Sequence, residues 1–245
     1  MMKRVVAFLV FSALACLAVS PVPAGSGPGV LSSSGTNTFT ATCSAGTNLV
    51  EVVALLNQGT ISVATSGGTA MTLAASYTGG TYPLYVYTIP LGASSGARTI
   101  IIVSTGQVIS NWACYDGVNQ TGQPEAKTLG QHTTGTTQNA TITGVTATAL
   151  LLGIYINDNG NPVTPGTGSS GTTVNVLRQL GPVGTNGYIQ IVDSNTTTVT
   201  TGSNNFGVFA AGDYVSSQPI DGLVMSLGPL ASTQVPQVGG FLVGP

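Results

Sequence analysis

The densest alternation of apolar and polar positions lies at 99–118, in the sequence TIIIVSTGQVISNWACYDGV. This pattern fits the two-residue period of β-strands. Two such runs meet at Gly106 and Gln107, and a short connection that contains Gly favours a turn between paired strands. We therefore predict a β-hairpin at the centre of the sequence.

Similar runs follow along most of the chain, separated by turn residues, and no segment has a sustained helical period with caps. Strands are expected at 37–43, 48–57, 60–65, 70–77, 82–89, 98–104, 108–118, 139–143, 147–157, 172–180, 187–193, 205–215 and 221–228. This pattern predicts an all-β fold, a two-layer antiparallel β-sandwich of the jelly-roll or Greek-key type, with a single domain at 37–230.

The two halves of the chain resemble each other weakly. TNLVEVVALLN at 47–57 matches TALLLGIYIN at 148–157, 66–90 matches 169–194, and 110–120 matches 217–227. A repeat at about 100 residues indicates an internal duplication. We expect two Greek-key halves whose strands interleave between the sheets.

Three of the expected strands, at 48–57, 98–104 and 147–157, are apolar on both faces. A sandwich strand with one face in the core should carry polar residues on the other. Something must therefore cover the second face of these strands. Loops of the same chain and a second copy of the protein are the two alternatives.

The start of the chain has the order of a secretory signal peptide. Basic residues at 3–4 precede an apolar run that ends at Pro21, and small residues stand before Gly25. We expect residues 1–24 to be removed by cleavage after Ala24, and 25–36 to be a linker. The apolar run is too short for a stable membrane span. At the other end, 231–245 is an apolar tail able to add a strand to a neighbouring sheet.

Charged residues make up only 5% of the chain, against 42% hydrophobic residues, and ordinary domains carry about 25% charged residues. Without 1–24, three basic residues face seven acidic ones, a net charge of −4. Affinity for nucleic acids depends on neutralised phosphates, so nucleic acid is not an expected partner. Low charge also removes the repulsion that keeps proteins apart.

Cys43 and Cys114 remain after the expected cleavage, and the alternation places both thiols on inward faces. Export makes a disulfide between them the expected state. Two buried free thiols are the alternative.

The motifs that suggest catalysis lack their structural context. A nucleophile-elbow pattern at 92–96 is followed by strand residues rather than a helix, and a GxGxxG pattern at 166–171 is as well. The only histidine, His132, lies in a hydroxyl-rich segment without a nearby carboxylate. The segment at 157–162 offers calcium a single carboxylate, Asp158. We therefore expect no enzyme, no cofactor and no metal.

One pair of aromatic residues suggests a binding surface. Tyr85 and Tyr87 lie two residues apart and so share a face of the strand at 82–89. Two tyrosine rings on one face are able to stack on a sugar. Half-buried tyrosines of an ordinary sandwich are the alternative.

The central motif YDGVNQTGQP, from Tyr115 to Pro124, resembles a loosely defined group of bacterial and phage β-sandwich proteins. Their centre commonly reads SGVDQTTP and their last strand ends like GVALRP. The likeness extends over about residues 36–230. In this chain Asn119 replaces the usual Asp, and Gly122 interrupts the Thr-Pro ending. The resemblance implies a β-sandwich and export, and it implies no activity.

These observations favour a secreted, non-catalytic structural or adhesive protein that associates with its own copies through β-surfaces. A carbohydrate-binding module that recognises surface glycans is the first alternative. A surface or decoration protein of a phage virion, suggested by the resemblance alone, is the second.

Overall fold

The computed structural model of the protein describes residues 20–32, 34–57, 59–79, 83–129, 137–157, 163–165, 175–179, 188–194, 199, 201–210 and 220–230. These residues form strands β1 to β17 and no helix. Each strand pair whose register is defined is antiparallel. The antiparallel β-sandwich predicted from the alternation is thereby confirmed.

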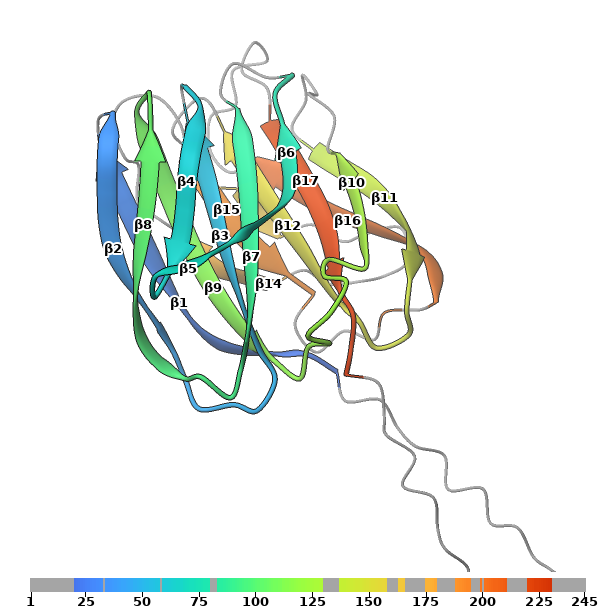
Figure 1. Ribbon diagram of the computed structural model, residues 1–245. Coiled ribbons are helices and arrows are strands. Elements are labelled where there is room, and N and C mark those ends of the chain that lie inside the picture. The colour runs from blue at the N-terminus through green and yellow to red at the C-terminus, as the bar shows by residue number, and fades with distance from the viewer. Residues whose placement is uncertain are drawn as a thin grey trace, which may run out of the picture.

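The strands form four sheets, two from each half of the chain (Figure 1). Inner sheet 1 has the order β1 (Val22–Ser32), β9 (Val108–Asp116), β3 (Leu49–Asn57), β7 (Leu84–Gly92) and β6 (Thr72–Tyr77). Outer sheet 1 has the order β2 (Gly35–Cys43), β8 (Gly96–Ser104), β4 (Ile61–Ser66) and β5 (Thr69–Ala70). Inner sheet 2 has the order β10 (Ala126–Leu129), β17 (Ile220–Leu227), β12 (Leu150–Asn157), β15 (Tyr188–Asp193) and β14 (Asn175–Gln179). Outer sheet 2 has the order β11 (Thr137–Val145), β16 (Gly202–Ala210) and β13 (Val163–Pro165).

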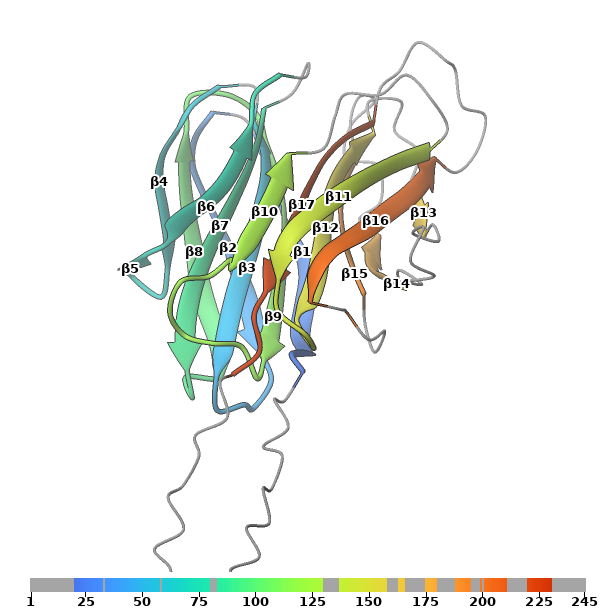
Figure 2. The same cartoon turned by 90° about the vertical axis from the view of Figure 1, so that its right-hand side faces the viewer.

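The four sheets are stacked as layers, with the two inner sheets facing each other (Figure 2). A hydrophobic core lies between each sheet and the next. The central core, between the inner sheets, draws on both halves of the chain: Val50, Val52, Ala54, Leu56, Ala75, Leu84, Val86, Ile109, Ala113, Tyr115, Val118, Leu150, Leu152, Ile154, Ile189, Ile191, Leu223, Met225 and Leu227. A second cluster, called the first core, lies between inner sheet 1 and outer sheet 1 and includes Leu49, Ile100 and Trp112. A further cluster, called the third core, lies between inner sheet 2 and outer sheet 2 and includes Ile142, Leu151 and Phe206.

Strand order confirms the internal duplication. Sequence matching pairs β3 with β12 and β9 with β17, and each pair occupies the same place in its inner sheet. In both halves the first strand lies at the edge beside the last strand, and the chain passes several times between an inner and an outer sheet, which is a jelly-roll arrangement. The expectation that the halves interleave is wrong, because none of the sheets formed by the described strands contains strands from both halves.

Two of the three strands expected to be apolar on both faces, β3 and β12, are buried on both faces. In β3, Val50, Val52 and Ala54 face the central core, while Leu49 and Val53 face the first core. The same holds for β12, whose two faces enter the central and third cores. Both faces are covered by the same chain: the other half covers the face in the central core, and the outer sheet of the same half covers the other face. In β8 of outer sheet 1, by contrast, one face remains partly exposed.

The expected hairpin at 99–118 is wrong. β8 pairs with β2 and β4 in outer sheet 1, whereas β9 pairs with β1 and β3 in inner sheet 1. The burial patterns give the physical reason. Eight of the nine residues of β9 are buried, as a strand covered on both faces requires, while β8 alternates between buried and more exposed positions. The segment around Gly106 therefore joins two layers.

The linker expected at 25–36 is wrong as well, because β1 extends over Val22–Ser32 and pairs with β9. The strand was not recognised because its glycines interrupt the alternation of apolar and polar residues. A Cβ atom on Gly27 would lie 3.1 Å from the indole ring of Trp112, and one on Gly25 would lie 2.5 Å from the Thr42 carbonyl oxygen. The Val30 N–H donates to Ser110 Oγ at 2.7 Å. Small residues are needed where this edge strand packs closely on its neighbours.

Candidate functional site

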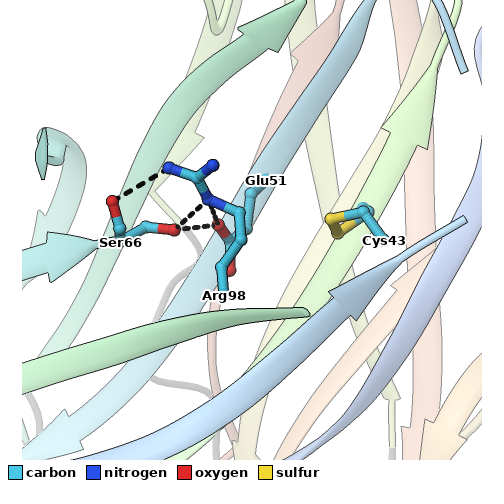
Figure 3. Close-up of a disulfide and its surroundings, with 5 residues drawn as sticks. Cys43, Glu51, Ser66 and Arg98 are labelled. Carbon is cyan, nitrogen blue, oxygen red and sulfur yellow. Dashed lines mark hydrogen bonds and ion pairs between the residues drawn. A yellow bond between two sulfur atoms is a disulfide. The ribbon is translucent and has the colours of Figure 1, made fainter. Parts of the chain in front are cut away.

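Cys43 and Cys114 form the predicted disulfide (Figure 3). Cys43 ends β2 in outer sheet 1 and Cys114 lies in β9 of inner sheet 1, with 5.7 Å between their Cα atoms. The bond therefore links the two layers of the first half. Their sequence separation is 71 residues, and closing a loop of that length stabilises by about 4 kcal/mol in the chain-entropy model.

A buried polar cluster lies close to this disulfide, formed by Glu51 of β3, Ser66 of β4 and Arg98 of β8 (Figure 3). Ser66 Oγ donates a hydrogen bond of 2.6 Å to Glu51 Oε2. Arg98 Nε donates to Ser66 Oγ at 2.9 Å, and Arg98 Nη2 donates to the Ser66 carbonyl at 3.0 Å. Arg98 Nε also lies 4.0 Å from Glu51 Oε2. The cluster joins inner sheet 1 to outer sheet 1.

Burial dominates the electrostatics of this cluster. The Glu51 side chain is fully buried, whereas that of Arg98 is 20% exposed. Desolvation raises the pKa of Glu51, and the hydrogen bond from Ser66 and the positive charge of Arg98 oppose this shift. Glu51 Oε1 has no hydrogen-bond partner among the described residues. Such a group is costly to bury.

The geometry of the cluster favours a structural role. Ser66 is fully buried and its hydroxyl is held between Glu51 and Arg98, so a substrate cannot reach it. This cluster was not predicted from the sequence. A signal was nevertheless present, because Glu51 shares its strand face with Leu49 and Val53. A carboxylate on a buried face needs a partner.

The expected sugar platform lies on β7 and faces the first core. Tyr87 belongs to this core and is only 9% exposed, and Tyr85 packs against it partly buried. Burial raises the pKa of the Tyr87 hydroxyl, with a smaller contribution from Tyr85. A stacking platform needs ring faces open to the solvent, so this pair is not arranged as one.

The central motif lies in the connection between the two halves, residues 117–125. Its backbone is bound to the end of β17 by three hydrogen bonds: Asn119 N–H to Gly228 C=O at 3.0 Å, Leu230 N–H to Gly117 C=O at 2.9 Å, and Glu125 N–H to Ser226 C=O at 3.0 Å. Val118 also forms a β-bridge with Pro229. The connection therefore attaches the second half to the first.

Two carboxylates hold the ends of this connection. Asp116 Oδ1 accepts the N–H groups of Thr47 and Asn48 at 3.1 and 2.9 Å. Glu125 accepts both the N–H and the hydroxyl of Thr146, at 2.9 and 2.7 Å. It also accepts the hydroxyl of Ser226 at 2.7 Å. Asp116 thus orders a loop distant in sequence, between β2 and β3.

A cavity of about 300 Å³ lies beside the 117–125 connection. Its lining comes from inner sheet 1 and from the connection: Val50, Thr72, Thr88, Pro90, Gln120, Gly122 and Gln123. Gln120 is fixed at both ends of its amide, because Oε1 accepts the Gly92 N–H at 2.8 Å and Nε2 donates to the Val118 carbonyl at 2.9 Å. Gln123 Oε1 accepts the Gly228 N–H at 2.9 Å.

A second cavity, of about 370 Å³, lies between β6 and Lys127 of β10. Its lining comes mostly from consecutive residues of β6: Leu73, Ala74, Ala75 and Ser76. The Lys127 ammonium donates a hydrogen bond of 2.6 Å to the Ala74 carbonyl. Lysine on the edge of a sheet blocks pairing with another chain. This side chain therefore protects the open edge of β6.

Of the remaining motifs noted in the sequence, only the one at 92–96 lies within the described residues. The pattern at 92–96 forms a turn between β7 and β8, with no helix after it, so it lacks the structure of a nucleophile elbow. His132, Asp158, the pattern at 166–171 and the tail at 231–245 lie outside the described residues.

Within the described ranges, no group of three or more His, Cys, Asp or Glu side chains is placed to hold a metal ion. In the same part of the chain, no helix has the length and apolar character to cross a membrane. Comparison of the chain with protein-family models, with curated proteins and with solved structures found no match. The resemblance based on the central motif stays a prediction.

Proposed function

We propose that the chain is an extracellular, non-catalytic structural or adhesive protein in which two jelly-roll halves act as one unit. The observation that carries this proposal is the use of the buried and half-buried carboxylates. Glu51 and Asp116 join segments of the first half, and Glu125 joins the connection to the second half. Catalysis by carboxylates needs groups that reach a substrate, whereas these groups hold strands and loops together.

The shared central core supports action as one unit. Strands β3 and β9 of the first half and β12, β15 and β17 of the second bury apolar side chains against each other. Asn111 of β9 adds a polar contact, because its Nδ2 donates to the Ile189 carbonyl of β15 at 3.2 Å. Exposing this core would cost hydrophobic free energy in both halves. A disulfide in the first half suits a protein exposed to an oxidising environment.

Fewer β-surfaces are open to self-association than the sequence suggested. The apolar second faces of β3 and β12 are covered within the chain, so they offer no surface to another copy. Low charge still favours association. A contact formed by the tail at 231–245 is the form of assembly that we retain in the proposal.

The mass of the protein in solution tests this proposal. Light scattering over a concentration series should give a mass that grows with concentration for the full chain. A variant that lacks 231–245 should remain a monomer. A monomer in both cases would reject self-assembly and leave adhesion to another surface. Assembly in both cases would place the contact on the sandwich body.

The adhesive role has its own test, which is independent of assembly. A tagged chain secreted by a bacterial host should be recovered with the cell surface and matrix rather than in the cleared medium. A buried-core variant that fails to fold should lose this retention, and an unrelated secreted protein with the same tag should stay in the medium. Full recovery of the folded chain from the medium would contradict the proposal.

A further inference from the structure

The cavity beside the 117–125 connection goes beyond a structural role. We infer that it binds a small, uncharged ligand that carries hydroxyl groups, of the size of one sugar ring. Ligand sites are commonly cavities of about 300 Å³ or more with apolar walls and a few fixed polar groups. This cavity has about that volume. It also lies where the first half meets the connection to the second, a place typical of binding sites.

The polar groups of the cavity are positioned before a ligand arrives. Thr88 of β7 is only 3% exposed, yet its side chain lines the cavity. The Thr88 side chain supplies one hydroxyl to the lining. Thr72 brings a second hydroxyl from the exposed start of β6. The Gln123 amide is held through its oxygen by Gly228, so its Nε2 remains a donor of fixed position. Preorganised groups of this kind lose little entropy when they bind.

The lining also restricts the chemistry of the ligand. None of the seven lining residues carries a charge, so a charged ligand would be desolvated without a partner. Val50 and Pro90 offer apolar contact, while the hydroxyls and the amide offer hydrogen bonds. A neutral sugar ring combines apolar C–H groups with hydroxyls that both donate and accept. The site differs from the expected tyrosine platform, which lies on the opposite face of β7.

Titration of the full chain followed by two-dimensional amide NMR tests this inference. The probes are the methyl glycosides of glucose, galactose and N-acetylglucosamine, with glucuronate and glucosamine as charged counterparts. At least one neutral probe should shift the amide signal of Gly122 in a saturable way. The charged probes should not do so. No saturable shift with any neutral probe, or equal binding of the charged probes, would overturn the inference.

Two variants locate the binding. Thr88→Val keeps the shape of the side chain but removes its hydroxyl, so it should weaken binding about tenfold, as expected when a buried donor or acceptor of the ligand loses its partner. Thr72→Phe at the exposed rim should block the cavity even if Thr88→Val does not fold. Thr99→Val on the exposed side of β8 is the matched control and should bind like the wild type. Unchanged binding in Thr72→Phe would place the ligand elsewhere and refute the site.

Discussion

Removing the Arg98 side chain should destabilise the protein by leaving Glu51 buried without a cationic neighbour. Loss of one partner from a buried ion pair costs about 3–5 kcal/mol. Arg98 is 20% exposed, its Nε lies 4.0 Å from Glu51 Oε2, and Ser66 continues to donate to the carboxylate. For Arg98→Met we therefore expect a smaller loss, about 2 kcal/mol near pH 7. Glu51→Gln removes the charge but keeps an acceptor for Ser66, so its stability should stay within about 1 kcal/mol of the wild type.

The pH dependence of these variants distinguishes the charge from the packing. The pKa of Glu51 is raised above its ordinary value of 4.5 by burial. Below pH 4.5 the Glu51 carboxyl is protonated in both the folded and the unfolded protein, so the stability that comes from burying its neutral form is fully present. As the pH rises through the raised pKa, the unfolded chain ionises first and this stability is lost. Glu51→Gln should therefore gain stability relative to the wild type between about pH 4 and pH 7.

Urea unfolding followed by fluorescence is a suitable assay, because the single tryptophan, Trp112, is 5% exposed in the first core. Arg98→Met should lose less stability near pH 4 than near pH 7, since a protonated Glu51 does not need the guanidinium. The double variant of Glu51→Gln and Arg98→Met should be more stable near pH 7 than the sum of the two single changes predicts. Equal losses for Arg98→Met at both pH values, together with additive single changes, would show that Glu51 is not a buried charge held by Arg98.

Three further predictions concern the layers and the ends of the chain. Replacement of Cys43 and Cys114 by serine should lower the unfolding free energy by about 4 kcal/mol in the chain-entropy model, and a reductant should then have no further effect on the urea midpoint; a drop with reductant that persists in the variant would contradict this. Lys127→Met should lower stability by about 1 kcal/mol, because the edge carbonyl of Ala74 loses a donor, and light scattering should show more association than for the wild type. The cleavage expected after Ala24 would remove the first residues of β1, although Ala24 is buried and its carbonyl accepts the N–H of Ser44 at 2.6 Å. The structure therefore corrects that position: if the chain is exported by cleavage, mass spectrometry should find the new N-terminus before β1, and an N-terminus at residue 25 would contradict this.

The sequence predicted the local features of the fold well, because strand alternation and inward-facing thiols depend on neighbouring residues. The strands at 48–57 and 147–157 were even recognised as covered on both faces. The pattern could not show which surface covers these strands, since an apolar face indicates burial but does not identify the surface that buries it. β1 was missed for a related reason, because its contacts with Trp112 and Ser110 require glycine rather than an apolar side chain.

The candidate site was less predictable than the fold. Glu51, Ser66 and Arg98 come from three strands in two sheets, and only the stacking of those sheets brings them together. The same holds for the cavity, whose lining joins β3, β6 and β7 to the connection. The tyrosine platform failed because alternation shows which residues share a face and does not show which face is exposed.

The pairing of the first strand with the last in each half determines when the chain can fold. Val22 of β1 lies opposite Asp116 of β9, so inner sheet 1 cannot close its edge until residue 116 has been synthesised. In the second half, Ala126 of β10 lies opposite Ser226 of β17. Contacts between residues so distant in sequence form slowly. Each half therefore stays open until its own last strand has been synthesised, at residue 116 in the first half and at residue 226 in the second. An open polypeptide is the form that a narrow export channel accepts, so this strand order suits the extracellular role that we propose.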